Sequence, residues 1–292
     1  MKPASFEYHR PTGLGEVLTL LAEAGQHGKV LAGGQSLVPV LNMRLAAPRQ
    51  LIDINAVREL AYVRVVDGDV EVGALARHAD LERDAAAYAA IPLLRRATAH
   101  VAHATIRNRG TTVGSLVHAD PAAEMPAVLT LLNGHVTLAS TGGRRTVAAA
   151  DFFVGPLESC IRPGELAVSA TFPAPPPGTG SAWLELSRRH GDYALCGVGV
   201  LVTLDPDLRV VAARAALISV GPVPVLVDLA DAVAGRHVDA ADWSAAAALA
   251  AAAAEPEDDI HATAAYRGHL AEVLTARALR AAAQEASAHV RT

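Results

Sequence analysis

The sequence predicts an α+β protein, with a two-part N-terminal region and a C-terminal domain of antiparallel sheet and helices. Three observations support this fold class. Short apolar strands alternate with helical segments over the first 55 residues, and strands joined by tight turns dominate much of the rest. A chain of 292 residues, 51% of them hydrophobic, can also form two or three cores. We therefore divide the chain into residues 1–55, 56–176 and 177–292.

Residues 1–55 are predicted to form a β-α-β-α-β unit. Its elements are an entry strand within Met1–Thr12, a helix over Gly13–Ala24, a strand at Val30–Ala32, a helix over Leu37–Leu45 and a strand at Gln50–Ile54. In the second helix, apolar residues recur at helical spacing and are expected to face a core: Leu37, Val40, Leu41 and Leu45.

Residues 56–176 are predicted to contain two hairpins, several helices and a further strand. The turn dipeptides Asp67-Gly68 and Gly142-Gly143 each separate two apolar runs. The expected elements are strands at Ala61–Val66, Asp69–Val72, Val136–Ala139, Arg144–Ala148 and Gly164–Pro173, and helices near His78–Asp84 and over Ile91–His103. His100 and His103 lack a neighbouring carboxylate or cysteine, so ordinary histidines are favoured over metal ligands.

A linker rich in proline and glycine, Pro173–Gly180, precedes the C-terminal domain. An antiparallel meander and then helices are expected after it. The strands are Ser181–Ser187, Gly197–Leu204 and Arg209–Ile218, and the helices are Val225–Ala234, Ala240–Ala254 and Tyr266–Ala288.

The stretch Val30–Arg44 is the first candidate binding element. It combines a short strand, a two-glycine turn and the start of a helix, with Ser36 as the expected N-cap. Gly33 and Gly34 carry no side chain, so the free N–H groups at the helix start are open to a phosphate or pyrophosphate. The same residues also fit a tight turn that only caps a helix.

The stretch Thr105–Glu124 is the second candidate. Asp120-Pro121 predicts a helix start, with Asp120 as N-cap and Pro121 at the first helical position. In the functional interpretation, Thr111 and Ser115 donate to polar ligand atoms and Gly114 lets the backbone approach. In the alternative, Asp120 is only a cap and Glu124 only a favourable first-turn charge. Two such loops favour a long, two-ended ligand.

Composition excludes several classes of protein. A net charge of −5 with scattered Lys and Arg argues against nucleic acid as a partner. No apolar run has transmembrane length and no leader pattern occurs, so a soluble cytoplasmic protein is expected. The two cysteines, Cys160 and Cys196, are too few for a disulfide scaffold or an iron–sulfur cluster. Zinc spacing, a P-loop and a complete nucleophile elbow are absent from the sequence.

Five groups of motifs occur in a fixed order along the chain. They are AGGQSLxP at 32–39 with Arg44, RNRGT at 107–111 with HADPAAE at 118–124, GEL at 164–166, RRxGDYA at 188–194, and DIHxxxxYR at 259–267. Together they resemble the FAD-binding medium subunits of molybdenum hydroxylases, the relatives of carbon monoxide dehydrogenase and xanthine dehydrogenase. The resemblance covers essentially the whole chain. It implies a two-subdomain flavin-binding region of the PCMH type, followed by the C-terminal domain.

The resemblance also implies where FAD binds. The first turn would hold the pyrophosphate through backbone N–H groups, and the second would hold it from the other side. Asp120 and Glu124 would lie near the ribityl or phosphate region, Leu166 would supply backbone contacts, and Tyr193 would lie close to the isoalloxazine ring. The expected cofactor-binding residues are Leu31, Ala32, Gly33, Gly34, Gln35, Ser36, Leu37, Thr111, Thr112, Val113, Gly114, Ser115, Asp120, Glu124, Leu166 and Tyr193.

The implied function is electron transfer in a three-component oxidoreductase. A small subunit with two [2Fe–2S] clusters and a large subunit with molybdopterin would be the partners, and a small molecule would be the electron acceptor. FAD supplies the redox chemistry, so neither a general base nor a metal site is expected in this chain. Two alternatives remain: a self-sufficient flavin oxidase and a nucleotide-binding adaptor without redox chemistry.

The chain departs from the family pattern at two positions. Val113 replaces the first of two glycines that relatives usually carry after the threonine, and a β-branched residue does not easily adopt a positive φ. Leu184-Glu185 stands where relatives often carry a lysine before the arginine pair. The second departure bears on a basic contact to the flavin and on the preferred acceptor.

Overall fold

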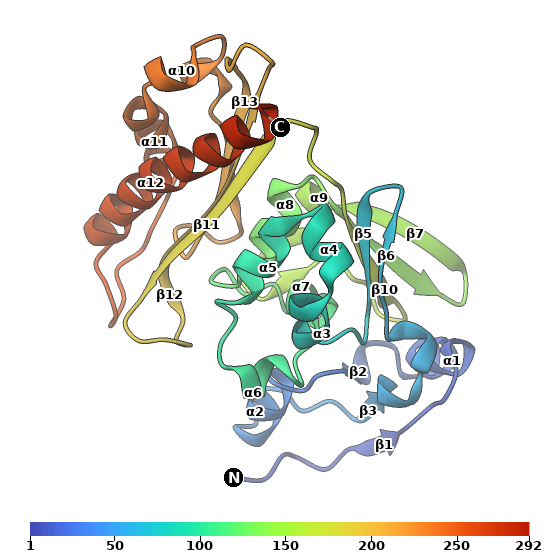
Figure 1. The fold of residues 1–292 in the computed structure, drawn as a ribbon. Helices are drawn as coiled ribbons and strands as arrows, with labels where there is room; N and C mark the ends of the chain where they lie inside the picture. The colour runs from blue at the N-terminus through green and yellow to red at the C-terminus, as the bar shows by residue number, and fades with distance from the viewer. Residues whose placement is uncertain (292) are drawn as a thin grey trace.

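The computed structural model describes residues 1–291, and it confirms the predicted β-α-β-α-β unit at the N-terminus (Figure 1). A three-stranded parallel sheet has the order β1-β3-β2. The elements of this unit are β1 (Glu7–His9), α1 (Leu14–Ala24), β2 (Gly28–Leu31), α2 (Leu37–Asn42) and β3 (Gln50–Asp53). Val17 and Leu21 of α1 are buried, as an amphipathic helix over the sheet requires.

Helix α2 is shorter and more exposed than its apolar spacing predicts. Of the four residues expected to face a core, only Leu41 is buried, and Leu45 is 73% exposed. The helix ends at Asn42 because Arg44 adopts a left-handed conformation, with φ of 59°, which cannot continue a right-handed helix. Leu45 therefore leaves the helical face on which the periodicity placed it.

The second unit is a five-stranded antiparallel sheet, of order β4-β5-β10-β6-β7, with helices packed against it. Both predicted hairpins are present, and the first turns through Asp67 and Gly68, both with positive φ. The strands are β4 (Val63–Val66), β5 (Asp69–Gly73), β6 (His135–Ser140), β7 (Gly143–Ala148) and β10 (Leu166–Phe172), with a separate pair β8 (Phe153–Gly155) and β9 (Glu158–Ser159). The helices are α3 (His78–Arg83), α4 (Ala85–Ala90), α5 (Pro92–Thr98), α6 (Ala104–Arg107), α7 (Thr112–His118), α8 (Glu124–Leu131) and α9 (Ala149–Phe152).

The helix predicted over Ile91–His103 is wrong in its extent. Ile91 is not helical, Pro92 occupies the first turn of α5, and that helix ends at Thr98. His100 and His103 consequently lie in the loop before α6, and their sequence spacing does not place them on one helical face.

The C-terminal domain is an antiparallel meander covered by helices, as predicted, but it has four strands rather than the three expected. Its elements are β11 (Thr179–Ser187), β12 (Ala194–Leu204), β13 (Val210–Ile218), β14 (Val225–Asp228), α10 (Ala230–Val233), α11 (Trp243–Ala252) and α12 (Ala264–Arg291). The helix predicted over Val225–Ala234 is wrong for its first half, because Val225–Asp228 pairs with the free edge of β13. A tertiary partner overrides local propensity there.

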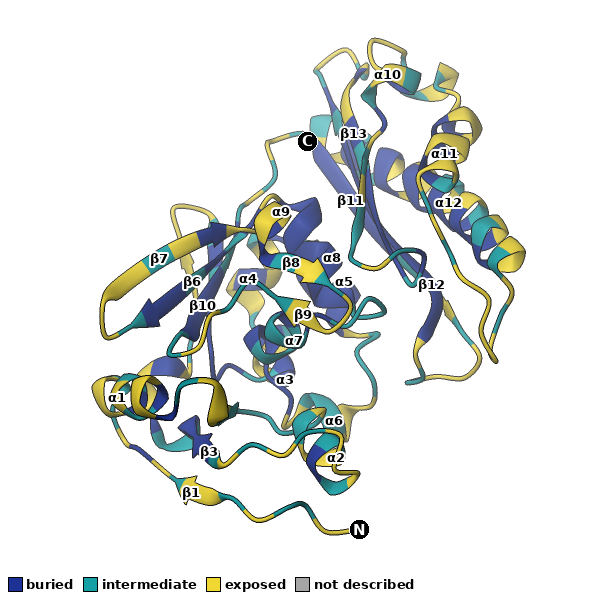
Figure 2. Cartoon of the chain, turned by 180° about the vertical axis from the view of Figure 1, so that it is seen from behind, coloured by how far each residue is buried: buried dark blue, intermediate teal, exposed yellow. Residues whose placement is uncertain are grey.

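Helix α8 joins the two halves of the molecule. All eight of its residues are buried, and it contacts β12 and β13 (Figure 2). The N-terminal core extends onto the meander through Trp183, Leu201 and Ile218, while α12 covers β11 and β12 with a second core. Arg96 of α5 also pairs with Glu285 of α12 at 2.6 Å. None of the helices in residues 1–291 is long and apolar enough to cross a membrane.

Candidate functional site

The first turn, residues 33–37, leaves a run of backbone donors open. The N–H groups of these five consecutive residues donate to no acceptor within residues 1–291. Gly34 has φ of 74°, a left-handed conformation that favours glycine and redirects the chain from β2 into α2. Polar N–H groups gathered without internal partners form a binding surface for an anion.

The predicted N-cap function of Ser36 is wrong. Its side chain makes no capping hydrogen bond, and its φ and ψ of −93° and −43° are already helical. A capping side chain requires an extended backbone to reach back to the first turn of the helix. The first turn therefore lacks the side-chain partner that the sequence suggested for its N–H groups.

The second turn satisfies most of its own donors. Thr111 is the N-cap of α7, and its Oγ1 accepts from the Gly114 N–H at 3.1 Å. The N–H of Thr112 donates to the Ala76 carbonyl at 3.3 Å, and that of Ser115 to the Thr111 carbonyl at 3.0 Å. The Thr111 hydroxyl hydrogen donates to no described residue, although Thr111 is buried, and Ser115 is partly exposed.

Val113 fits this turn without a positive φ. It is the second residue of α7 and is buried in the N-terminal core, with 1% of its surface exposed. The valine thus contributes packing where relatives usually carry glycine. The backbone N–H groups of Val113 and Thr111 donate to no residue described in the structure, which leaves two open donors in the second turn.

The two turns touch each other at Gly33. A Cβ atom placed on Gly33 would lie 2.5 Å from the Arg109 carbonyl oxygen, 2.8 Å from the Gly110 Cα and 3.0 Å from the Thr111 nitrogen. Only a glycine permits this approach, because real Cβ atoms do not come so close to backbone. Open N–H groups, hydroxyls and the absence of a side chain at this junction fit a diphosphate.

Asn55 and Arg77 support the junction, and sequence reasoning missed both. Asn55 Nδ2 donates to the Ala32 carbonyl at 2.8 Å, and Arg77 donates to Asn55 Oδ1 at 2.6 Å and to the carbonyl of Arg109. Asp53 accepts from Asn55 and from the Tyr8 hydroxyl, anchoring the network in the parallel sheet. The sequence signal that could have identified them is their position: Asn55 comes two residues after the buried strand β3, and Arg77 comes directly before the helix α3.

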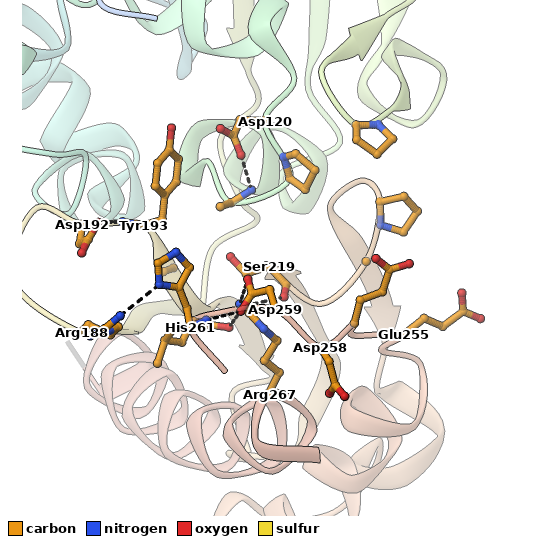
Figure 3. Close-up of a pocket in the computed structure, with 18 residues that line it drawn as sticks. Asp120, Arg188, Asp192, Tyr193, Ser219, Glu255, Asp258, Asp259, His261 and Arg267 are labelled. Atoms are coloured by element: carbon orange, nitrogen blue, oxygen red, sulfur yellow. Dashed lines mark hydrogen bonds and ion pairs between the residues drawn. The ribbon is translucent and has the colours of Figure 1, made fainter. Parts of the chain in front are cut away.

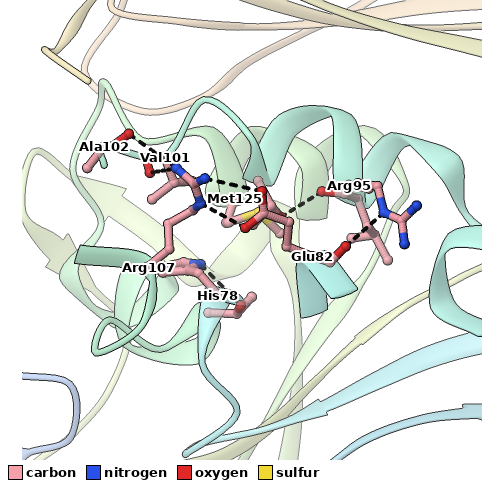
Figure 4. A network of polar contacts seen from close by, with 10 residues as sticks. His78, Glu82, Arg95, Val101, Ala102, Arg107 and Met125 are labelled. Atoms are coloured by element: carbon pink, nitrogen blue, oxygen red, sulfur yellow. Dashed lines mark hydrogen bonds and ion pairs between the residues drawn. The ribbon is translucent and has the colours of Figure 1, made fainter. Parts of the chain in front are cut away.

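His78 holds the second turn from below. The backbone N–H of His78 donates to the Gly110 carbonyl at 3.0 Å, and the ring Nδ1 lies 3.3 Å from the Thr112 hydroxyl. Burial, with a smaller contribution from the Arg107 charge, lowers the pKa of His78 to about 4, so the ring is neutral at pH 7. Figure 4 shows Arg107 above it, paired with Glu82 at 2.9 Å and bonded to the carbonyls of Val101 and Ala102.

The predicted helix start at Asp120 is wrong. Helix α7 runs away from the junction and ends at Ala119, whose φ of 53° turns the chain, and α8 begins only at Glu124. Asp120 accepts from the Ala122 N–H at 2.9 Å within the intervening turn. Since seven residues of α-helix span about 10 Å, α7 links the junction of the two turns to a second location around Asp120.

A cavity of about 660 Å³ lies at this second location, between the N-terminal region and the C-terminal domain (Figure 3). Asp120, Pro121 and Ala122 line one side. Tyr193, from the loop between β11 and β12, lines the other and is 69% exposed despite its size. The Ser219 N–H donates to the Pro121 carbonyl at 2.9 Å, which ties the two sides together.

Two buried carboxyls, from α8 and β11, lie close enough for their charges to interact. Glu124, the first residue of α8, is 8% exposed, and the Glu185 side chain on β11 is 4% exposed. Glu185 accepts from Trp183 Nε1 at 3.2 Å and lies 4.0 Å from His100 Nδ1. Burial raises the pKa of both carboxyls, and the neighbouring Glu185 charge raises that of Glu124 further.

Three predicted residues lie outside the two turns and the cavity lining. Leu31 ends β2 and Ala32 follows it, so both lead into the first turn. Leu166 begins β10, is buried, and pairs with Ala139 of β6. Within residues 1–291, the histidines, cysteines and acids form no group of three that could hold a metal ion.

Two family models match the chain. The model of the FAD binding domain in molybdopterin dehydrogenase matches residues 4–175, and that of the CO dehydrogenase flavoprotein C-terminal domain matches residues 181–282. Together they include both turns and the loop that carries Tyr193.

Relatives match over nearly their whole length. Subunit alpha of the 6-hydroxypseudooxynicotine dehydrogenase complex from Paenarthrobacter nicotinovorans is 40% identical, over 96% of this chain and 95% of that protein. The carbon monoxide dehydrogenase medium chain of Afipia carboxidovorans is 35% identical, over 96% and 97%. A crystal structure of quinoline 2-oxidoreductase from Pseudomonas putida 86 matches with a TM-score of 0.92 and 36% identity, over 98% of this chain and 99% of that chain.

Proposed function

We propose, from the premise that this chain belongs to the family of FAD-binding medium subunits of molybdenum hydroxylases, that it takes electrons from a partner subunit and passes them to an external acceptor. The chain is thus a subunit of an oxidoreductase and binds FAD. The observation that carries the assignment of the binding site is the run of five unpartnered N–H groups at residues 33–37.

The diphosphate of FAD would bind where the two turns meet. Backbone N–H groups from Gly33 to Leu37 would donate to it from one side. The Val113 N–H and the hydroxyls of Thr111 and Ser115 would donate from the other. Charge-assisted bonds from N–H groups to phosphate oxygens are stronger than bonds between neutral groups. Leu31, Ala32, Thr112 and Gly114 would contribute only backbone to the wall of the diphosphate site, and none of their side chains would enter it.

The isoalloxazine end would lie toward the cavity. Helix α7 separates the junction from Asp120 by about 10 Å, a span that an extended dinucleotide can bridge. Tyr193 offers an exposed aromatic face there, and Asp120 and Glu124 would lie near the ribityl chain. FAD supplies the redox chemistry when bound, and the side chains around it position it and control which molecules reach it. Leu166 would contribute backbone contacts.

The partners would be a small subunit with two [2Fe–2S] clusters and a large subunit with molybdopterin. Relatives named as the medium chain of carbon monoxide dehydrogenase and as one subunit of a dehydrogenase complex support an assembly of several chains. The two cysteines of this chain are fewer than the four thiolates of a typical cluster, so the clusters would belong to another chain. The substrate would be hydroxylated in the large subunit.

Purification of the tagged full-length chain from its native host tests this function. We expect co-purified chains that contain iron and molybdenum, and a flavin that denaturation releases intact. When the flavin-containing chain is mixed with the reduced iron–sulfur subunit, the flavin absorbance should bleach. A flavin that stays covalently attached, with no partner chains, would favour a self-sufficient oxidase. A chain that never acquires flavin absorbance after addition of FAD would favour a nucleotide-binding adaptor.

A further inference from the structure

Arg77 lies between the two turns and is bonded to both sides of their junction. Its Nη2 donates to Asn55 Oδ1 at 2.6 Å, and the amide of Asn55 in turn holds the Ala32 carbonyl before the first turn. Its Nη1 donates to the carbonyl of Arg109, directly before the second turn. Arg77 also forms an antiparallel bridge with Thr111. One side chain thus connects the two elements that would flank the diphosphate.

The Arg77 guanidinium has no carboxylate as an ion-pair partner within residues 1–291. Asp80 accepts from the Arg77 backbone N–H instead, and Asp53 is occupied by Tyr8 and Asn55. Burial and the like charge of Arg109 lower the pKa of Arg77, and the more distant charges of Asp80 and Asp53 offset this only in part, so its surroundings disfavour the positive charge. A half-buried cation without a counter-ion is costly until an anion arrives.

A guanidinium carries five N–H donors, and Arg77 uses two of them in the bonds above. The other three donate to no described residue. We propose that Arg77 is a positioning residue that fastens the two turns together and supplies the positive charge against which the FAD diphosphate binds. This inference rests on the proposed diphosphate position. It assigns a charged recognition group to a site that otherwise consists of backbone N–H groups and hydroxyls.

Titration of the apo full-length chain with FAD and with riboflavin, which lacks the diphosphate, tests the proposal. Arg77→Gln should weaken FAD binding by about 10- to 100-fold, the range expected for a charged hydrogen bond. The variant should leave riboflavin binding unchanged and reduce the dependence of FAD affinity on NaCl concentration. Arg77→Lys keeps the charge but loses the two-pronged geometry, so it should recover part of the affinity.

Unfolding of the apo protein separates this role from a purely structural one. Without FAD, Arg77→Gln should lower the melting temperature by no more than a few degrees, because loss of the two hydrogen bonds is offset by removal of a half-buried cation that forms no ion pair within residues 1–291. The stabilisation by added FAD should shrink. Arg64→Gln is the matched control, since Arg64 lies on β4 and pairs with Glu71. Wild-type FAD affinity in Arg77→Gln, or equal losses for FAD, riboflavin and apo stability, would overturn the inference. Failure of the wild-type chain to bind FAD would instead overturn the proposed function.

Discussion

The two turns that meet at Gly33 differ in how far they satisfy their own hydrogen bonds. In the second turn, Thr111 caps α7, His78 contacts the Thr112 hydroxyl, and two N–H groups, those of Thr111 and Val113, stay open among the residues described. The first turn has no side-chain cap and leaves five N–H groups open. The difference supports the proposal that the second turn is a preformed support and that the first turn would be completed by the diphosphate. The largest losses of FAD binding and stability should therefore come from substitutions that push the two turns apart.

Gly33→Ala should break the contact between the turns. The new methyl group would collide with the Arg109 carbonyl and the Gly110 backbone, which cannot yield as a flexible side chain would. We expect loss of bound FAD and a decrease in the free energy of unfolding of about 1–3 kcal/mol, as for other overpacked sites. Flavin absorbance per chain and urea denaturation measure the two effects.

Gly15→Ala is the control for this substitution. Gly15 lies in α1, and a Cβ atom there meets nothing within 4 Å. Alanine is favoured over glycine in a helix, so this variant should keep FAD and gain about 0.5–1 kcal/mol. If Gly33→Ala behaved like Gly15→Ala, the close approach of the turns would not matter.

The pH dependence of stability should arise on the side of the second turn, where Glu124 and Glu185 are buried. Both carboxyls keep their protons in the folded chain to a higher pH than in the unfolded chain. Below pH 6.5 the lowered pKa of His78 acts in the opposite direction. Between pH 6.5 and about pH 8 the two carboxyls dominate and the folded state binds more protons, so the free energy of unfolding falls as pH rises. Urea denaturation across this range should show a loss on the order of 2 kcal/mol.

Replacement of both carboxyls tests the origin of this slope. The double variant Glu124→Gln/Glu185→Gln should be less sensitive to pH and more stable than the wild type at pH 8. Glu23→Gln, at an exposed position of α1, should keep the wild-type slope. An unchanged slope in the double variant would mean that other groups set the pH dependence.

The difference in capping between the two turns predicts smaller and unequal changes in the free energy of unfolding. Thr111→Val removes the hydroxyl that accepts from Gly114, which should cost about 1 kcal/mol. Ser36→Ala removes a side chain that makes no capping bond, so the free energy of unfolding should change by less than about 0.5 kcal/mol. Chemical denaturation of the two apo variants provides the comparison. Equal losses would show that Ser36 caps α2 in solution.

The smallest expected effect is on the rate of flavin reoxidation by charged acceptors. It arises at the far end of α7, where carboxylates surround the cavity. Six acids line it against two arginines, Arg188 and Arg267: Asp120, Asp192, Glu255, Glu257, Asp258 and Asp259. Ion pairs occupy Asp259 and Asp192, through Arg267 and Arg189. The remaining negative field should slow anionic acceptors and attract cationic ones.

Flavin reoxidation in the assembled complex measures this selectivity. From low to high salt, the rate with a cationic acceptor should fall a few-fold and that with an anionic acceptor should rise, because salt screens exposed charges. A neutral quinone serves as the internal control. Glu255→Gln/Glu257→Gln should weaken both trends. Identical salt responses for all three acceptors would show that the cavity is not on the path of the acceptor.

Local patterns predicted the parts of the fold that local interactions determine. The β-α-β-α-β unit, both hairpins and the meander follow from periodicity and turn dipeptides, and the structure contains them. Two of the errors fall where a distant partner decides, whereas those at Ser36, Arg44 and Ile91 come from local backbone conformation. Val225–Asp228 is a strand because β13 offers an edge, and Asp120 faces a cavity that two distant segments create.

The site shows the same division. Glycine-containing motifs identified the two turns, but no pattern showed that Gly33 would touch Gly110, because that contact joins residues far apart in the chain. Asn55 and Arg77 escaped notice for the same reason: each is an ordinary polar residue until the fold places it beside a carbonyl of another segment. The contribution of individual residues to FAD binding stays a prediction for the experiments above.

The complete burial of α8 has a consequence for how the polypeptide can be divided. The proline-rich segment before β11 looks like a convenient place to cut, yet a fragment ending there would expose the face of α8 that packs on β12 and β13. Such a fragment should aggregate, and the meander expressed alone would lack a cover over Trp183 and Ile218. Exchange of the C-terminal domain between relatives would therefore have to keep the residues of α8 matched to those of β12 and β13.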